Sequence, residues 1–320
     1  LTNFLEENGH NVDILSSDNT FTIPIRKLKN PSFMVSSFFK TKLKKKYDIV
    51  HAQNIPAAIA LKGASGKKII SLHGIHHEQV ELLHGSFLGN AAKNFERYAL
   101  ECVDAITVSS KEMYEHYTKL GYIVHYIPNS IDISNLPKET DRKYKKQIIY
   151  AARLSKEKGI LDVLEMSLKL PKDIHILILG TGPEKKKVLD ACNTKSNIHY
   201  LGYQEQKKVI EIIRGSDILI QPSLVEGGTS YTLLESMACK TPIICSDVGG
   251  GKDVLHHLKN SYIIKPNNPS ELLNAIIELM NDDNKRKQLG KNGYDSILKY
   301  DWKIIGKNYL ELYSQILNLP

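Results

Sequence analysis

Residues 221–250 read QPSLVEGGTSYTLLESMACKTPIICSDVGG. The pattern predicts a strand that ends at Pro222–Ser223, a turn at Gly227–Gly228, a helix opened by Thr229–Ser230, and a second strand over 241–247. A strand, a turn, a helix and another strand in direct succession form the repeating unit of parallel α/β sheets.

The same alternation extends in both directions from this stretch. Downstream of residue 145 the predicted strands are 146–154, 174–182, 198–203, 217–223, 241–247 and 261–266. Upstream of it they are 47–52, 67–74, 104–110 and 122–130, with helices over 93–102 and 111–120. These two series predict an α/β protein with two Rossmann-like, doubly wound domains that face each other across a cleft.

The polar segment PKETDRKYKK (137–146) separates the two series and is the natural linker. We therefore expect an N-terminal domain over 1–138 and a C-terminal domain over 139–301. The tail places Trp302, Ile305, Tyr309 and further apolar residues at helical spacing. We expect this helix, 302–320, to pack back on the N-terminal domain.

The chain opens on LTNFLEENGHNV, which is typical of the end of an amphipathic helix with Gly9 as its C-cap. A strand is then predicted over Val12–Leu15. Because a doubly wound domain normally opens with a strand and a glycine-rich turn, we expect that this first strand and its loop are missing here.

Composition sets broad limits on function. The 320 residues suit two domains, and 42% hydrophobic with 24% charged residues excludes a disordered chain. The formal net charge of +8 favours anionic partners without choosing among them. No apolar run approaches the roughly 18 residues of a membrane-spanning helix. The four cysteines lack metal-ligand spacing and are predicted to be reduced thiols in a cytosolic protein: Cys102, Cys192, Cys239 and Cys245.

An anion site is predicted where the helix after the glycine turn begins. Free backbone N–H groups at a helix start bind phosphate oxygens, and glycines allow close approach of the backbone. Glu226 precedes this turn and Glu235 lies inside the helix, so the two acids could hold hydroxyls on either side of a diphosphate. The alternative is an ordinary helix start with two surface acids.

Two further stretches follow predicted strands. In RLSKEKGI (153–160), Arg153 and Lys158 would lie at the carboxyl edge of the second sheet and suit a diphosphate, unless they are only solvated charges. In LILGTGPEKKK (177–187), Gly180 and Gly182 begin a G-x-G-x-x-G pattern, but Lys185 stands at its last position. A glycine turn that lines the cleft is therefore favoured over a dinucleotide site.

The stretch SLHGIHHEQVELLH (71–84) is rich in histidine, but Glu81 breaks the H-E-x-x-H zinc pattern, so no metal site is expected. His73 ends a strand and could hydrogen-bond a substrate, or be structural.

The stretch PSFMVSSFFKTKLKKKYD (31–48) joins aromatic residues to Lys40, Lys42, Lys44, Lys45 and Lys46. It could lie on an anionic membrane or be a core helix with a lysine-rich end. No nucleic-acid-binding module is recognised.

Several of these stretches together resemble a known family. RLSKEKG, LILGTGP, YLGY and PSLVEGGTSYTLLESMACKTPIICSDVGG, in this order and spacing, are similar to the C-terminal half of retaining GT-B glycosyltransferases of family 4 (glycosyl transferases group 1). Upstream, YDIVHAQ, SLHG, VSS and IPNSID resemble the N-terminal half. The resemblance implies the GT-B fold for nearly the whole chain.

The resemblance also implies roles for individual residues. Arg153 and Lys158 would bind the donor diphosphate, Glu226 would hold hydroxyls of the transferred sugar, and Glu235 would bind the nucleotide ribose. His73 would approach the donor sugar from the N-terminal domain. The remaining donor-binding residues would be the backbone of Gly227, Gly228, Thr229 and Ser230 at the sugar and phosphate, of Leu201 and Gly202 at the base, and the turn of Gly180 and Gly182.

Two departures from the family pattern stand out. The family usually has seven residues between its two acids, whereas eight separate Glu226 from Glu235, the extra one resembling a second glycine. The family's glycine-rich loop after the first strand, which touches the donor phosphates and shapes the acceptor side, has no counterpart in this chain.

The leading hypothesis is transfer of a sugar from a nucleoside diphosphate sugar to an acceptor hydroxyl, with retained anomeric configuration and no metal or other cofactor. The base is expected to be uracil or guanine. The acceptor is expected to be lipid-linked or a saccharide, in glycolipid or polysaccharide synthesis, and a small alcohol stays open as a third acceptor class. A nucleotide-sugar epimerase of the same fold and a nucleotide-sugar-binding protein without catalysis are the alternatives. We expect a cytoplasmic protein with peripheral contact at the inner face of the membrane through 33–46.

Overall fold

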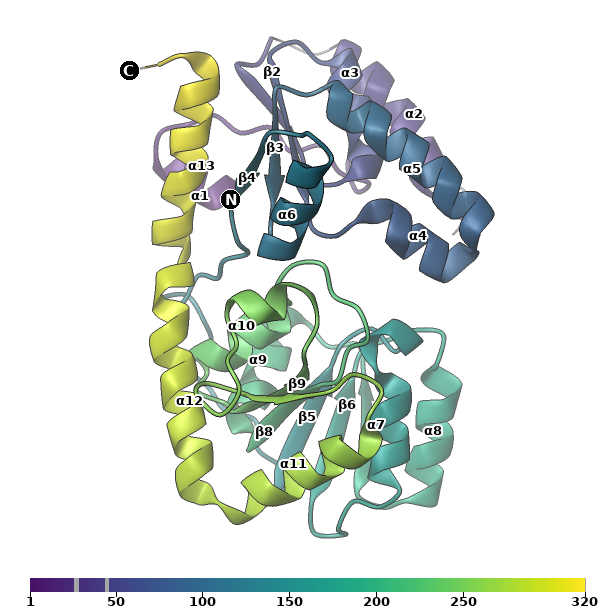
Figure 1. Cartoon of the computed structure of the whole chain (residues 1–320), viewed down its shortest axis with the longest axis vertical. Coiled ribbons are helices and arrows are strands. Elements are labelled where there is room, and N and C mark those ends of the chain that lie inside the picture. The colour runs from purple at the N-terminus through teal and green to yellow at the C-terminus, as the bar shows by residue number, and fades with distance from the viewer. Residues whose placement is uncertain (26–28, 44–45, 320) are drawn as a thin grey trace. The chain divides into compact units, whose positions relative to one another are not determined.

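The chain folds into two compact units. The computed structural model describes residues 1–25, 29–43 and 46–319. One unit comprises Leu1–Pro128 with Trp302–Pro320, and the other comprises Asn129–Asp301. The first change of unit falls at residue 128, where the sequence suggested 138. Each unit is built on one parallel sheet, as predicted, and the ribbon of each is traced in Figure 1.

The first unit has a four-stranded sheet in the order β1-β2-β3-β4. Its strands are β1 (Ile49–Ala52), β2 (Lys67–Leu72), β3 (Ala105–Val108) and β4 (Val124–Tyr126). Alternate residues of each strand point to opposite faces. Ile70 and Ile106 pack in the core that includes residues of α3 (Ala58–Gly63), α5 (Ser86–Glu101) and α6 (Lys111–Lys119).

The opposite face of this sheet is covered by the C-terminal helix α13 (Trp302–Leu317). Ile305, Tyr309 and Leu312 pack with Ile69 of β2 in one buried cluster. Their helical spacing in the sequence therefore predicted the correct element. The hydroxyl of Tyr313 also lies 2.7 Å from Nδ1 of the half-buried His51 in β1, which ties the helix to the sheet.

The N-terminal helix α1 (Thr2–Glu7) ends as predicted, but the strand expected after it is absent. Gly9, at φ +83°, donates its N–H to Glu6, and His10 donates to Leu5, which is the hydrogen-bond pair of a Schellman motif. The prediction of a strand over Val12–Leu15 is wrong. Among the described residues this segment makes no strand ladder, and Ile14 remains 58% exposed.

Two other helices of the first unit arise from stretches noted in the sequence. Helix α2 (Lys29–Lys42) covers most of the basic aromatic stretch, and α4 (His76–His84) covers the histidine-rich one. Lys44 and Lys45, which belong to the predicted membrane-contact segment, lie outside the described residues.

The second unit has a six-stranded sheet in the order β10-β9-β8-β5-β6-β7. The strands are β5 (Gln147–Ala151), β6 (His175–Leu179), β7 (Ile198–Gly202), β8 (Ile218–Gln221), β9 (Ile243–Ser246) and β10 (Tyr262–Ile264). All six predicted strands are confirmed, each shorter than its apolar run.

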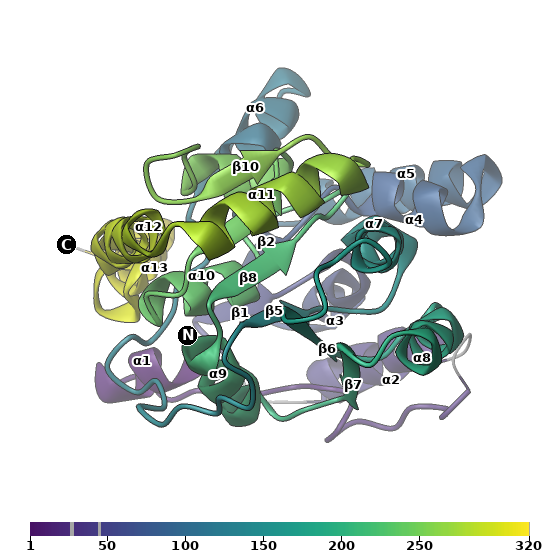
Figure 2. The ribbon, with the colours of Figure 1, turned by 90° about the horizontal axis from the view of Figure 1, so that it is seen from below.

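Helices cover both faces of this sheet. One core joins the sheet to α7 (Ile160–Ser167), α8 (Lys185–Thr194) and α11 (Pro269–Asn281). The other joins it to α9 (Gln206–Gly215) and α10 (Tyr231–Ala238), with the end of α12 (Asp283–Ile297). Figure 2 shows α7 and α8 on one side of these strands and α9 on the other. This is the doubly wound arrangement that the alternating pattern predicted.

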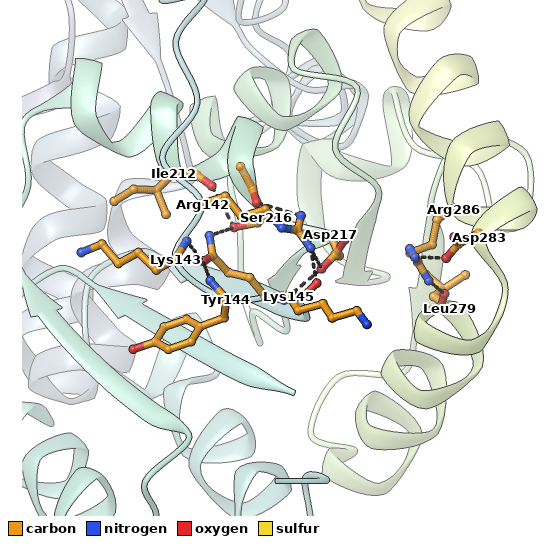
Figure 3. A network of polar contacts seen from close by, with 12 residues as sticks. Arg142, Lys143, Tyr144, Lys145, Ile212, Ser216, Asp217, Leu279, Asp283 and Arg286 are labelled. Atoms are coloured by element: carbon orange, nitrogen blue, oxygen red, sulfur yellow. Dashed lines mark hydrogen bonds and ion pairs between the residues drawn. The ribbon is translucent and has the colours of Figure 1, made fainter. Parts of the chain in front are cut away.

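The segment 137–146 packs within the second unit and is not a free linker. The Arg142 guanidinium donates to the carbonyl of Gly215 at 3.1 Å and to Asp217 at 2.8 Å. Figure 3 shows Arg142 beside Asp217. The side-chain oxygen of the buried Gln147 accepts the N–H of Lys143 at 2.9 Å. The polar residues of the segment 137–146 are therefore explained by its hydrogen bonds at the amino edge of the sheet.

Candidate functional site

The order of strands in the second unit creates a switch point between β5 and β8. From β5 the chain adds β6 and β7 on one side, then returns to place β8 and β9 on the other. Loops that leave the carboxyl ends of such neighbouring strands diverge, and ligands bind in the crevice between them. Lys158 follows β5 and Glu226 follows β8, so both predicted residues come from this point.

Lys158 and Glu226 form an ion pair across the switch point. The Lys158 ammonium lies 2.7 Å from each carboxylate oxygen of Glu226. The Lys158 side chain is 28% exposed and that of Glu226 is 10% exposed. Because an ammonium carries three N–H donors, this pairing leaves one of them for an incoming anion.

The loops that carry this pair are fixed to each other by backbone contacts. Gly159 adopts φ +71°, and a Cβ atom there would lie 1.7 Å from the carbonyl oxygen of Pro222. The N–H of Leu224 also donates to the carbonyl of Glu157 at 2.9 Å. Only glycine fits at this approach, which sets the distance between Lys158 and the loop of Glu226.

Arg153 precedes Lys158 on the same loop. Its guanidinium is half exposed and lies 3.6 Å from Glu157. Beneath the loop, the buried Tyr150 hydroxyl lies 3.2 Å from the carbonyl of Arg153 and 3.1 Å from that of Lys158. Burial, with the nearby Glu226 and Glu157 charges, raises the pKa of Tyr150, so the phenol stays protonated and supports the loop as a donor.

The glycine turn leads into α10 as predicted. Ser230 is the N-cap residue, but its side chain does not cap the helix. Leu233 donates its N–H to the carbonyl of Ser230, so the N–H groups of Tyr231 and Thr232 are the first-turn donors left for another acceptor among the described residues. The turn is braced by the 3₁₀ segment Gly249–Asp253. Thr229 donates its hydroxyl to the carbonyl of Gly250 at 2.6 Å, and Gly250 donates its N–H to Gly227 at 2.9 Å. Gly228 is buried beside this contact.

Glu235 lies within α10 and is 4% exposed. The amide of Gln206, the first residue of α9, donates to its Oε1 at 2.8 Å. Burial raises the pKa of Glu235, and the hydrogen bond from Gln206 partly opposes this rise. The predicted ribose ligand is therefore a carboxyl group that becomes protonated at a higher pH than an exposed glutamate.

The remaining predicted residues lie at the ends of β6 and β7. Gly180 and Gly182 follow β6, and a Cβ at either would meet the backbone of the loop after β5 at 2.0 and 2.3 Å, respectively. Gly180 donates its N–H to the carbonyl of Gly202 at 2.8 Å. The carbonyl of Leu201 accepts the Gln204 amide at 2.6 Å. The glycines thus allow neighbouring loops to pack closely.

His73 belongs to the other unit. It is exposed directly after β2. Burial, and to a smaller extent the electrostatic interaction with His73, lower the pKa of His51 to about 3. The structure brings Lys158 and Glu226 into direct contact and holds Arg153, the glycine turn and Glu235 in the same unit. The binding and catalytic roles assigned to all of these residues stay predictions.

Three site residues were not predicted from the sequence. Gln206 holds Glu235, while Gln221 and Ser223 donate to Glu226 Oε1 at 3.0 and 2.8 Å. Gln221 and Ser223 flank Pro222 at the carboxyl end of a buried strand, and that position was a usable signal. Gln206 lies far from Glu235 in sequence, and nothing local marks it.

The histidine-rich stretch contacts a buried acid of the same unit. Nδ1 of His77 lies 3.2 Å from the buried Glu96, which also accepts the Tyr117 hydroxyl at 2.6 Å. In the described part of the chain, no group of three or more His, Cys, Asp or Glu side chains is arranged to hold a metal ion. The four cysteines are free thiols.

Comparison with known proteins covers both units. A family model described as "Glycosyl transferases group 1" matches residues 132–296, and "Glycosyltransferase Family 4" matches residues 1–135. The uncharacterized glycosyltransferase MJ1178 of Methanocaldococcus jannaschii is 27% identical over 84% of this chain and 76% of its own length. Another from that organism, MJ1069, is 30% identical over 57% of this chain, and the match spans only 48% of that relative.

A phosphatidyl-myo-inositol mannosyltransferase of Mycobacterium leprae is 24% identical over 62% of this chain and 55% of its own length. The chain thus matches about half the length of two of these three relatives.

Solved structures share the fold at low identity. Sucrose-phosphate synthase from Thermosynechococcus elongatus superposes with a TM-score of 0.78 at 19% identity, over 92% of this chain and 80% of that one. HepE of Anabaena in complex with UDP-glucose superposes with a TM-score of 0.75 at 16% identity, over 98% of this chain and 88% of that one. The sheets, the switch point and the family match agree: the chain belongs to the glycosyl transferases group 1 family and has the GT-B fold.

Proposed function

We propose that this chain transfers a glycosyl group from a nucleoside diphosphate sugar to an acceptor hydroxyl, with retention of anomeric configuration. The observation that carries the proposal is the Lys158–Glu226 ion pair at the switch point of the second sheet. It joins a cation suited to a diphosphate with an acid suited to sugar hydroxyls. Membership of the family supports the same assignment.

The charge distribution of the site fits this reaction. Breaking the glycosidic bond leaves a diphosphate anion and an oxocarbenium-like carbon, so groups that stabilise the developing negative charge lower the barrier. Lys158 has one N–H left after pairing with Glu226. The guanidinium of the exposed Arg153 is planar and can donate two parallel hydrogen bonds to a phosphate. The N–H groups at the start of α10 add a third source of positive potential. We propose that these groups stabilise the diphosphate without a divalent ion.

Retention is proposed to follow from attack on the face from which the diphosphate leaves. Glu226 is poorly suited to act as a covalent nucleophile, because both of its oxygens already accept hydrogen bonds from Lys158. The leaving phosphate oxygen would then take the proton of the acceptor hydroxyl, which balances the transfer without a separate protein base.

Uridine diphosphate sugars are the first donors to test. Among the structural neighbours, HepE was solved with UDP-glucose and TarM of Staphylococcus aureus with UDP. We propose a uracil nucleotide for this chain on that basis, with a guanine nucleotide as the second choice.

The central experiment replaces Lys158 with alanine. We expect Lys158→Ala to lower the rate of sugar transfer at least about 100-fold, because a charge-stabilising donor is lost. The melting temperature should change little, since the side chain is partly exposed. Lys156→Ala is the matched control, because Lys156 is an exposed lysine of the same 3₁₀ segment, Lys156–Lys158.

Product analysis separates this proposal from its rivals. The assay follows transfer from a panel of nucleoside diphosphate sugars to lipid-linked and saccharide acceptors, with each donor also incubated alone. Epimerised sugar without an acceptor, or donor binding with no product in the whole panel, would contradict transfer. Unchanged transfer by Lys158→Ala would remove Lys158 from the mechanism.

A lipid-linked acceptor is proposed from an apolar groove in the first unit. The groove has a volume of about 660 Å³ and is lined mainly by Phe21, Ile23, Pro31, Val35 and Phe39. Phe21, Val35 and Phe39 are exposed. No helix among the described residues is long and apolar enough to span a membrane. Relatives named for phosphatidyl-myo-inositol and for a diphospho-undecaprenol-linked sugar agree with an acceptor of this class.

Vesicle binding tests this groove, which adjoins the lysines of α2. Apolar side chains flanked by cations bind anionic bilayers. The double variant Val35→Asp, Phe39→Asp should lose most co-sedimentation with anionic phospholipid vesicles. Ile123→Asp, at another exposed apolar position of the same unit, is the control and should bind as the wild type does. Equal binding by all three proteins would contradict the membrane contact.

A further inference from the structure

Gln221 is a buried glutamine whose two amide atoms bind two different site residues. It is the last residue of β8 and is 3% exposed. Its Nε2 donates to Glu226 Oε1 at 3.0 Å, and its Oε1 accepts the Ser230 hydroxyl at 3.2 Å. A single side chain on a rigid strand thus connects the acid in the loop with the residue that begins α10.

These bonds act on the loop that departs from the family spacing. Eight residues separate Glu226 from Glu235, one more than usual, and an added residue gives a loop more conformations to lose on ordering. Gln221 fixes this loop at its middle, Glu226, and at its end, Ser230. A site residue held by a rigid element is placed more precisely than one held by its own loop.

The contacts also distinguish the two oxygens of Glu226. Oε1 accepts from Lys158, Gln221 and Ser223, whereas Oε2, within the described structure, accepts from Lys158. Each carboxylate oxygen has about two acceptor positions. Oε1 is therefore fully used, and the capacity that remains lies on Oε2.

We propose that Gln221 is a positioning residue that turns the Glu226 carboxylate so that Oε2 alone accepts one hydroxyl of the donor sugar. The proposal rests on the proposed function. Gln221 acts through Glu226 and does not touch the donor. It therefore affects recognition of the sugar and leaves recognition of the nucleoside diphosphate to Lys158, Arg153 and the start of α10.

The test compares a sugar-bearing donor with the bare nucleoside diphosphate. Gln221→Met keeps the length of the side chain and removes both hydrogen bonds. We expect kcat/KM for the nucleoside diphosphate sugar to fall at least about tenfold, because a hydrogen bond to a charged group is lost. The dissociation constant of the nucleoside diphosphate alone, measured by calorimetry, should stay within about threefold of the wild type.

Gln147→Met is the matched control. Gln147 is also a buried glutamine bonded on both sides, at the start of β5 and thus at the opposite edge of the same sheet. Gln147→Met should lower the melting temperature while kcat/KM stays within about threefold of the wild-type value. A kcat/KM of wild-type size in Gln221→Met, or equal losses for donor and bare nucleoside diphosphate, would overturn the positioning role.

A second variant decides the question if Gln221→Met does not fold. Gln221→Glu keeps an acceptor for Ser230 but places a carboxylate against Glu226, so we expect at least the same loss of kcat/KM. Wild-type kcat/KM in Gln221→Glu would overturn the proposal. A wild-type chain that binds no nucleoside diphosphate sugar at all would instead refute the proposed function, which is a distinct result.

Discussion

Glu235 combines a polar role with a buried position in α10. Its carboxylate must be ionised to accept ribose hydroxyls most strongly, yet burial favours the protonated form and raises its pKa. Gln206 supplies the hydrogen bond that opposes this effect. If Glu235 binds the ribose as predicted, nucleotide affinity depends on pH.

We predict that affinity for the nucleoside diphosphate falls as the pH drops through the raised pKa of Glu235. The fall should begin at a higher pH than an exposed glutamate would give. Titration calorimetry across the acidic range measures it. Glu235→Gln should bind about tenfold more weakly at neutral pH and lack this acidic loss. An identical pH dependence in both proteins would exclude Glu235 as its source.

The raised pKa of Glu235 affects folding stability in the opposite direction to nucleotide affinity: its contribution to stability decreases as the pH rises. Because the pKa of Glu235 is raised in the folded protein, the folded state holds a proton that the unfolded chain releases in the window between the two pKa values. The contribution of Glu235 to folding is most favourable below the unfolded pKa and declines as the pH rises through the folded one. Relative to wild type, Glu235→Gln should gain thermal stability as the pH rises.

At the scale of elements, the junction between the loops after β5 and β8 depends on one backbone conformation. Gly159 ends the 3₁₀ segment that carries Lys158 and also begins α7. We predict that Gly159→Ala lowers the free energy of unfolding by at least about 2 kcal/mol, since a left-handed residue and a clash with Pro222 are combined. Denaturant unfolding followed by circular dichroism measures this change.

Gly202→Ala is the matched control for Gly159→Ala. Gly202 has the same φ of +71°, but a Cβ there would meet only the Tyr200 hydroxyl, at 4.0 Å. Gly202→Ala should therefore lower the free energy of unfolding by only about 1 kcal/mol, the cost of a left-handed backbone without a clash. Equal losses in the two variants would mean that the approach to Pro222 is not what requires glycine.

The elements also show what the sequence could and could not predict. Continuous apolar runs such as Ile148–Ile149–Tyr150 predicted buried parallel strands, because both faces of such a strand are covered by helices. The run at Val12–Leu15 is also mainly apolar but has no ladder in the described structure, and a local pattern does not show whether another strand pairs with it.

The site also contains residues that the sequence could predict and residues that it could not. Lys158 and Glu226 could be predicted because each directly follows a recognisable strand at the carboxyl edge of the sheet. Gln206 could not, because its partner Glu235 is 29 positions away and is reached only through tertiary folding. Glutamine side chains carry no periodic signal, so the contact between Gln206 and Glu235 emerges only from the folded structure.

At the scale of the whole molecule, each unit has its own sheet and its own core, and the last helix belongs to the first unit. The predicted phosphate and ribose ligands all lie in the second unit, Asn129–Asp301. Folding of the first unit and nucleotide binding by the second should therefore respond to different substitutions.

Leu312→Ala tests this separation. Leu312 is buried against the first sheet from α13, so its truncation should cost about 2–5 kcal/mol in that unit. Differential scanning calorimetry should show two transitions, of which Leu312→Ala lowers one. The nucleoside diphosphate should raise the other, because a ligand stabilises the folded unit that binds it. Glu311→Ala, at the exposed neighbouring position, should change neither transition. A single transition that both Leu312→Ala and the nucleotide shift would show that the units fold as one, in which case damage to α13 would also weaken nucleotide binding.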